Sequence, residues 1–180
     1  MTYGRISDVV ARLKKKYEES DPFRLCKAMG IILIFRSMGT APDAIKGFYF
    51  EARRIRTITV NADLPSVSQK IILAHELGHA VLHQNSGVHA FHDASLFDES
   101  SLYEKEANLF AAEFLLDDNE VIETLNGDTT FFSAARALYV PMELLDFKFR
   151  MMKRKGYKLM ESPIMAGSDF LRNMEIPYDE

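Results

Sequence analysis

The 180-residue sequence has no tryptophan, a single cysteine and no long apolar run. The one thiol, Cys26, excludes an internal disulfide, and its apolar helical surroundings indicate a buried small side chain rather than a nucleophile. The longest plainly apolar run, Ile31 to Phe35, is far too short to cross a bilayer. The N-terminus also lacks the apolar core of a signal peptide. These absences predict a cytoplasmic protein that is not associated with a membrane.

A strong charge of either sign is absent too. The net charge of −4 argues against a general nucleic-acid binder, whose surface would be basic. The hydrophobic fraction of 47% is ordinary for a globular protein, so the chain can bury a core. The length predicts one domain with a small addition.

The most informative stretch runs from Ile71 to His83, which we interpret as a helix carrying the pattern H-E-x-x-H. His75 and His79 lie four residues apart, so both imidazoles project from one face and can bind one metal ion at about 2.0–2.1 Å. Glu76 is rotated by about 100° from His75, which puts its carboxylate beside the metal. There it can act as the general base of a zinc hydrolase. The alternative is a core helix whose histidines are surface or capping residues.

Four other residues of this helix bear on the interpretation. His83 continues the four-residue spacing, but it lies about 12 Å from His75 along the axis, too far to share one ion. We therefore expect His83 to be a polar residue near the helix end. Ser66 and Gln69 predict a capping box at the helix start. Gly78 costs about 1 kcal/mol relative to alanine within a helix, which the close approach of a second helix would justify.

That second helix is predicted from Ser101 to Leu116. It offers three candidates for a third, carboxylate ligand: Glu104, Glu106 and Glu113. We favour Glu104, because Asn108 lies one turn further on the same face, where its amide can bind the second nitrogen of a ligand histidine. Glu106 is the second choice. A capping box formed by Ser101 and Glu104 is the structural alternative.

The rest of the pattern predicts an α+β fold. Helices are expected over residues 6–18 and from Pro22, followed by a strand from Ile31 to Phe35. A hairpin is expected around Ala52-Arg53-Arg54. The result is a small, mainly antiparallel sheet of about three strands packed on the metal-binding helices.

We expect a metallopeptidase core over residues 1–125, a helical subdomain over 126–158 and a poorly packed tail over 159–180. The subdomain contains two helices joined by a short turn at Pro141, a pattern shared with helix-turn-helix proteins. Its basic residues gather at one end: Lys148, Arg150, Lys153, Arg154 and Lys155. We prefer packing on the core or on a partner protein to direct nucleic-acid binding.

Residues 61–83, followed by residues 104–112, resemble the ImmA/IrrE family of metallo-endopeptidases. The specific features are a strand ending at Asn61, the H-E-L-G-H helix and the pattern E-x-x-A-N-x-F-A. The last pattern is also similar to the second helix of gluzincin peptidases, which implies that Glu104 is the third ligand of a zincin-type site. Members often have proline after the Leu-Leu pair that closes this helix, where this chain has Asp117-Asp118. Asp117 can cap the next helix, so we interpret the difference as a changed linker.

The resemblance implies a cytoplasmic enzyme with one Zn²⁺ per chain, which makes a site-specific cut in a helix-turn-helix repressor of a mobile element, prophage or stress-response system. His75, His79 and Glu104 would bind the zinc, Glu76 would be the catalytic base and Asn108 would support a ligand. His89, His92 and Tyr103 are candidates for stabilising the oxyanion. The alternative is a non-proteolytic, metal-containing regulator that binds a repressor or DNA through its C-terminal helices.

Overall fold

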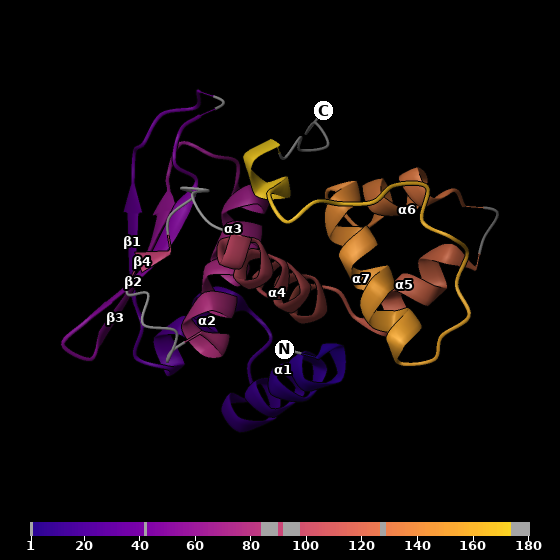
Figure 1. Ribbon diagram of the computed structural model, residues 1–180, viewed down its shortest axis with the longest axis horizontal. Helices are drawn as coiled ribbons and strands as arrows, with labels where there is room; N and C mark the ends of the chain where they lie inside the picture. The colour runs from indigo at the N-terminus through magenta and orange to yellow at the C-terminus, as the bar shows by residue number, and fades with distance from the viewer. Residues whose placement is uncertain (1, 42, 84–89, 92–97, 127–128, 174–180) are drawn as a thin grey trace.

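The computed structural model describes residues 2–41, 43–83, 90–91, 98–126 and 129–173 (Figure 1). The first half of this described part contains α1 (Tyr3–Tyr17), α2 (Pro22–Ala28), β1 (Ile32–Arg36), β2 (Gly47–Ala52), β3 (Ile55–Asn61) and α3 (Ser66–Leu82). The second half contains β4 (Ala90–Phe91), α4 (Asp98–Leu115), α5 (Asp118–Leu125), α6 (Phe131–Ala137), α7 (Met142–Arg154) and the short 3₁₀ helix η1 (Phe170–Asn173). The α+β class is confirmed.

The four strands form one sheet in the order β1-β3-β2-β4. The hairpin pair β2 and β3 is antiparallel, as is the pair β2 and β4, whereas β1 runs parallel to β3. The sheet is therefore mainly antiparallel, as expected, and the short strand β4 adds a fourth strand to the three that were predicted. Arg53 and Arg54 form the hairpin turn with φ of 50° and 68°, the left-handed conformation that two-residue hairpin turns require.

The inner face of the sheet packs against α3, which lies between the sheet and α4 (Figure 1). Ile58 and Val60 of β3 and Tyr49 of β2 are buried on this face. The contact is close at Gly47, where an added Cβ would lie 2.5 Å from the Ile72 side chain. Because it is covered by the sheet on one side and by α4 on the other, α3 is buried along most of its length.

The start of α3 differs from the predicted capping box. Pro65 is the N-cap residue, Ser66 is already inside the helix, and no side chain caps it. Gln69 does reach back, but its amide donates to the backbone oxygens of Leu64 and Ala62, at 2.6 and 3.3 Å. It therefore stabilises the turn before the helix, because free backbone carbonyls in that turn need donors.

The C-terminal helices are continuous with the rest of the molecule, since α7 packs on both α4 and α1. Their N-caps follow local signals: the side chain of Asp117 accepts from the backbone of α5, and that of Thr130 accepts from the backbone of α6. Residues 162–173 differ from the expected loose tail. Ala166 and Phe170 are buried, and Ala166 forms backbone hydrogen bonds with α7 side chains. The domain boundaries themselves stay a prediction.

Two expectations from the composition can be compared with the structure. Cys26 is fully buried, and this burial raises the pKa of its thiol to about 12, which fits a packing residue. Among the described helices, none combines the length and the apolar character that a bilayer span requires.

Candidate metal centre

The site lies where α3 and α4 approach each other most closely. Gly78 of α3 faces Ala107 and Phe110 of α4, and a Cβ at Gly78 would lie only 3.1 Å from the Ala107 Cα and 3.2 Å from the Phe110 Cβ. The expected helix contact thus explains why glycine occupies this position. The small residues at the crossing, Gly78 and Ala107, let the polar side chains on either side of them meet.

Three ligand atoms converge from the two helices. Glu104 Oε2 lies 3.1 Å from His75 Nε2, and Glu104 Oε1 lies 3.3 Å from His79 Nε2. The two Nε2 atoms are 3.0 Å apart. In the described part of the chain this is the one group of histidines and acidic residues found with the spacing of a metal site. Two imidazole nitrogens and one carboxylate oxygen are a donor set that suits zinc and leave a position for water or substrate.

The pKa shifts put His79 and Glu104 in the protonation states that metal binding needs, whereas the shift of His75 favours its protonated ring. Burial lowers the pKa of His79 to about 4, so its ring is neutral at neutral pH. Burial also raises the pKa of Glu104, but its hydrogen bonds with His75 and His79 outweigh this and hold the pKa well below its usual value. For His75, the hydrogen bond and charge of Glu104 overcome burial and raise the pKa. The carboxylate of Glu104 is therefore ionised.

Asn108 lies behind His75. Its Oδ1 is 2.7 Å from His75 Nδ1, and its Nδ2 donates to the backbone oxygen of Ser168 at 2.7 Å. An amide oxygen can only accept, so His75 carries its proton on Nδ1 and presents the Nε2 lone pair to the shared point. This is the position in which a residue orients a ligand histidine. That role stays a prediction for Asn108, as do the ligand roles of the three residues in front of it.

His83 was not expected to take part in the site, and Glu106 was only the second choice as a metal ligand. His83 is buried, with its Nδ1 3.0 Å from His79 Nδ1 and its Nε2 3.1 Å from Glu106 Oε2. If Glu106 accepts from His83 Nε2, then His83 Nδ1 is an acceptor for His79 Nδ1–H, and the His79 Nε2 lone pair faces the shared point. His83 does lie at the end of α3, as expected, but it is buried between His79 and Glu106, a position that was not predicted from the sequence.

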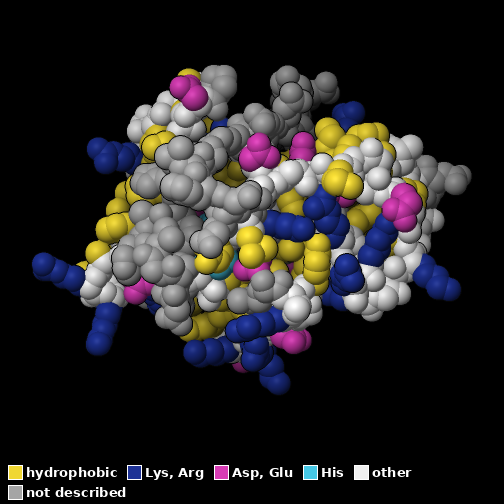
Figure 2. Space-filling model, in the orientation of Figure 1, with side chains coloured by type: hydrophobic (Ala, Val, Ile, Leu, Met, Phe, Trp, Pro, Cys, Tyr) yellow, Lys and Arg dark blue, Asp and Glu magenta, His cyan; other side chains and the backbone are white. Residues whose placement is uncertain are grey.

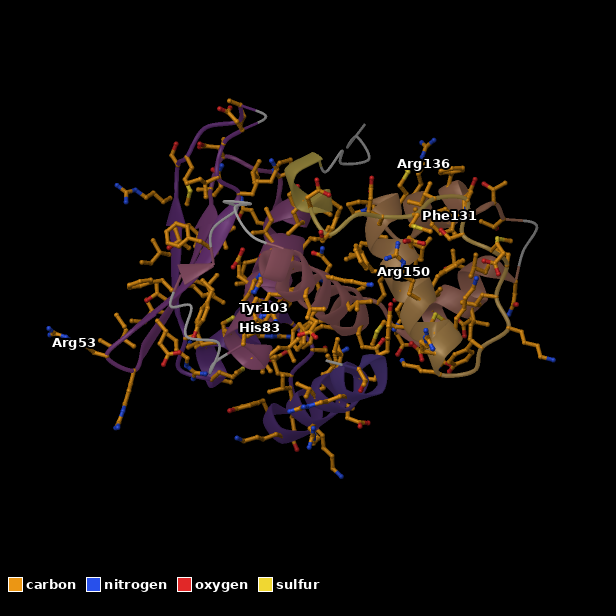
Figure 3. The ribbon with its side chains drawn as sticks, viewed as in Figure 1. Arg53, His83, Tyr103, Phe131, Arg136 and Arg150 are labelled. Carbon is orange, nitrogen blue, oxygen red and sulfur yellow. The ribbon has the colours of Figure 1, made fainter. Side chains whose placement is uncertain are left out.

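A signal for this pair was present in the sequence. His75, His79 and His83 repeat at four residues, which places all three on one face of α3. Distance excluded His83 as a ligand of the same ion, but it does not exclude contact with the neighbouring ring of His79. Figure 3 shows His83 between the two helices together with Tyr103, whose ring centroid lies 4.7 Å from that of His83.

Glu76 is buried on α3 next to His75 and is not part of the three-donor set. The chain packs closely around it, since a Cβ at Gly47 of β2 would lie 3.7 Å from Glu76 Cγ. A carboxylate that is buried next to His75 and interacts with its charge, outside the ligand set, is placed to accept a proton. Of the oxyanion candidates, His89 and His92 lie outside the described residues, and Tyr103 packs on His83.

The fold and the site together define a class: an α+β chain whose H-E-x-x-H helix packs against a second helix that carries a glutamate. Residues 26–150 match the peptidase family described as the IrrE N-terminal-like domain, and the chain belongs to this family. It is also similar to the "Uncharacterized immunity region protein 2" of Bacillus phage phi105, with 35% identity over 146 residues, which cover 81% of this chain and 90% of the phage protein.

Proposed function

We propose that this protein is a zinc-dependent endopeptidase. The observation that carries the proposal is the position of Glu76, buried beside the donor set of His75, His79 and Glu104 without being part of it. A structural metal site needs no fourth, uncoordinated carboxylate. A hydrolytic site needs one to take the proton of the attacking water. Membership of a peptidase family supports the same reaction class.

Each side chain of the site has a distinct role in this proposal. His75, His79 and Glu104 hold the ion, which when bound polarises the scissile carbonyl and lowers the pKa of water. Glu76 accepts the proton from the attacking water and passes it to the nitrogen of the leaving amine. The groups behind the histidines, Asn108 and His83, keep each Nε2 lone pair directed at the shared point.

We further propose that the substrate is a helix-turn-helix transcriptional repressor of a prophage, mobile element or stress-response system, cut at one site in the cytoplasm. The relative from Bacillus phage phi105 carries the name of an immunity region protein, which supports a phage setting. A helix-turn-helix repressor encoded beside this protein's gene would then be the candidate substrate. Incubating the two purified proteins with zinc and measuring the masses of the products tests this choice.

Glu76→Gln tests the proposed catalysis. The variant keeps the shape of the side chain but removes the base, so we expect normal zinc content and a loss of cleavage of about 10²–10⁴-fold. A matched control is Glu123→Gln on the exposed side of α5, which leaves cleavage unchanged. Undiminished cleavage by Glu76→Gln would contradict the assignment of the base.

The second candidate is a non-proteolytic regulator that binds DNA or a repressor through its C-terminal helices. Lys and Arg side chains do gather over α7 (Figure 2). Most of them are paired with carboxylates of the same chain, in the pairs Lys148–Glu113, Arg150–Asp146, Lys153–Glu161 and Lys155–Asp118. A surface that binds DNA needs Lys and Arg side chains that can contact the phosphates. Because these side chains are already paired with carboxylates, the pairing weighs against DNA binding. Regulation that is intact in Glu76→Gln would favour a repressor-binding regulator.

A further inference from the structure

The segment that follows α7, residues 159–173, turns back across the C-terminal helices and reaches α4 at Ser168 (Figure 1). We call it the C-terminal segment. It lies beyond residue 150, where the family match ends. It therefore adds something to the site that the matched region does not itself contain.

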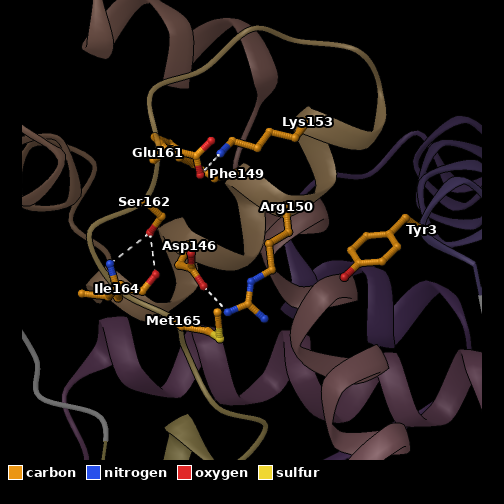
Figure 4. A pocket seen from close by; sticks show the side chains of 9 residues that line it. All are labelled: Tyr3, Asp146, Phe149, Arg150, Lys153, Glu161, Ser162, Ile164 and Met165. Carbon is orange, nitrogen blue, oxygen red and sulfur yellow. Dashed lines mark hydrogen bonds and ion pairs between the residues drawn. The ribbon is translucent and has the colours of Figure 1, made fainter.

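The C-terminal segment is fixed to α7 at Ala166. The backbone N–H of Ala166 donates to Asp146 Oδ2 at 3.1 Å, and Arg150 donates to the backbone oxygen of Ala166 at 2.9 Å. Asp146 and Arg150 also form an ion pair with each other (Figure 4). Phe170 is buried, with its ring centroid 5.6 Å from that of Phe147. Two side chains of α7 thus position both backbone polar groups of one residue.

Two residues beyond this anchor, the segment reaches α4. The backbone oxygen of Ser168 accepts from Asn108 Nδ2 at 2.7 Å. A carbonyl only accepts, so this contact fixes which end of the Asn108 amide carries nitrogen. The oxygen end then faces His75 Nδ1 at 2.7 Å. With the amide reversed, its N–H groups would face the proton of His75, and Asn108 would no longer favour the Nδ1–H form of the ring.

We propose that the C-terminal segment contributes to metal binding at the metal centre. By holding Ser168 against Asn108, it sets the orientation and tautomer of His75, and so it sets the affinity of the site for a divalent cation. Arg150 is the positioning residue at the base of this connection, since it binds Ala166 from α7. The inference rests on the proposed function only in requiring that His75, His79 and Glu104 bind a metal.

Arg150→Ala in the full-length protein tests the connection, with Co²⁺ as the probe. We expect the Kd for Co²⁺, measured in competition with a chelator, to rise by roughly tenfold, the lower end of the effect of residues that support metal ligands. The visible absorption of bound Co²⁺ should change as well, because the orientation of His75 changes. The matched control is Lys153→Ala, one turn further along α7, whose partner Glu161 at the start of the C-terminal segment is 93% exposed. This control should bind Co²⁺ as the unmodified protein does.

A double-mutant cycle separates positioning from general loosening of the fold. If Arg150 acts through Asn108, Arg150→Ala has no further effect on the Kd in the Asn108→Ala background. An unchanged Kd for Arg150→Ala, or effects of the two substitutions that simply add, would overturn the inference and leave the proposed peptidase intact. A protein that binds Co²⁺ with this dependence but cuts no repressor would overturn the proposed function and leave the inference standing.

Discussion

His75 and His79 lie one turn apart on the same face of α3, but the groups behind their rings differ in kind. Behind His75 are neutral groups, the Asn108 amide and the Ser168 carbonyl. Neutral partners orient a ring and select its tautomer, and they add no charge to a buried site. The His75 side therefore depends on geometry alone, and part of that geometry comes from the distant C-terminal segment.

Behind His79, the connection runs through a second ring, His83, to the carboxylate of Glu106. Burial lowers the pKa of His83 to about 3, so this ring is neutral and can accept from His79. A carboxylate at the end of such a connection raises the basicity of the ligand as well as orienting it. The two candidate ligands are thus supported in two ways, His75 by an amide and His79 by a second histidine that contacts a buried acid.

The largest effect is expected from removing the donor that both sides share. Glu104→Ala takes away one of three donors, so metal content should fall further than with any change behind the histidines, where losses are about 10–100-fold. Measuring zinc per chain after dialysis tests this. Glu106→Ala is the matched comparison from the same helix. Loss of zinc only in Glu106→Ala would show that the ligand assignment is wrong.

A smaller effect is expected from His83→Phe, which keeps a ring but removes both nitrogens. Zinc affinity should fall by about 10–100-fold, since His79 loses its partner. Stability should fall as well, by about 1–3 kcal/mol or more, because Glu106 stays buried without its histidine contact. Urea unfolding of the metal-free protein measures this second loss.

The double variant His83→Phe with Glu106→Leu distinguishes the two losses. Replacing both polar partners by apolar groups is often close to neutral for stability, so it should recover much of the stability. It should not recover zinc affinity, because no group then orients His79. Recovery of both would mean that the pair serves folding alone, and the contrast with His75 would disappear.

The sequence predicted what depends on local signals. The cap at Asp117 was expected from a short-range pattern, and its side chain accepts from the first turn of α5. The contact between two helices at the site could also be predicted. Helix geometry places both histidines of H-E-x-x-H on one face, and Gly78 indicates the close approach of a second helix. These features need no knowledge of distant parts of the chain.

What could not be predicted depends on contacts between distant segments. The role of His83 becomes visible only once Glu106 faces it across the helix contact, and an isolated fourth-residue repeat does not reveal that partner. The order of residues 162–173 depends on hydrogen bonds to the backbone of Ala166, and any residue type except proline offers the same backbone groups. Ser66 was misassigned because Pro65 takes the N-cap position one residue earlier.

The smallest expected effect tests whether the contact between α3 and α4 at Gly78 supports both His75 and His79. Gly78→Ala should gain about 1 kcal/mol from helix propensity but lose about 1–3 kcal/mol from the clash with Ala107, for a net loss of roughly 1 kcal/mol. Gly4→Ala in α1, where a Cβ meets nothing within 4 Å, is the control and should stabilise the protein. Both can be measured by urea unfolding.

Because Asn108 and Glu106 both lie on α4, the shift at Gly78 should weaken the support of His75 and of His79 together. Zinc affinity should then fall in Gly78→Ala, whether Asn108 or Glu106 has been substituted in the same chain. If either substitution abolishes the effect, the helix contact supports only that side, and the two ligands are positioned independently.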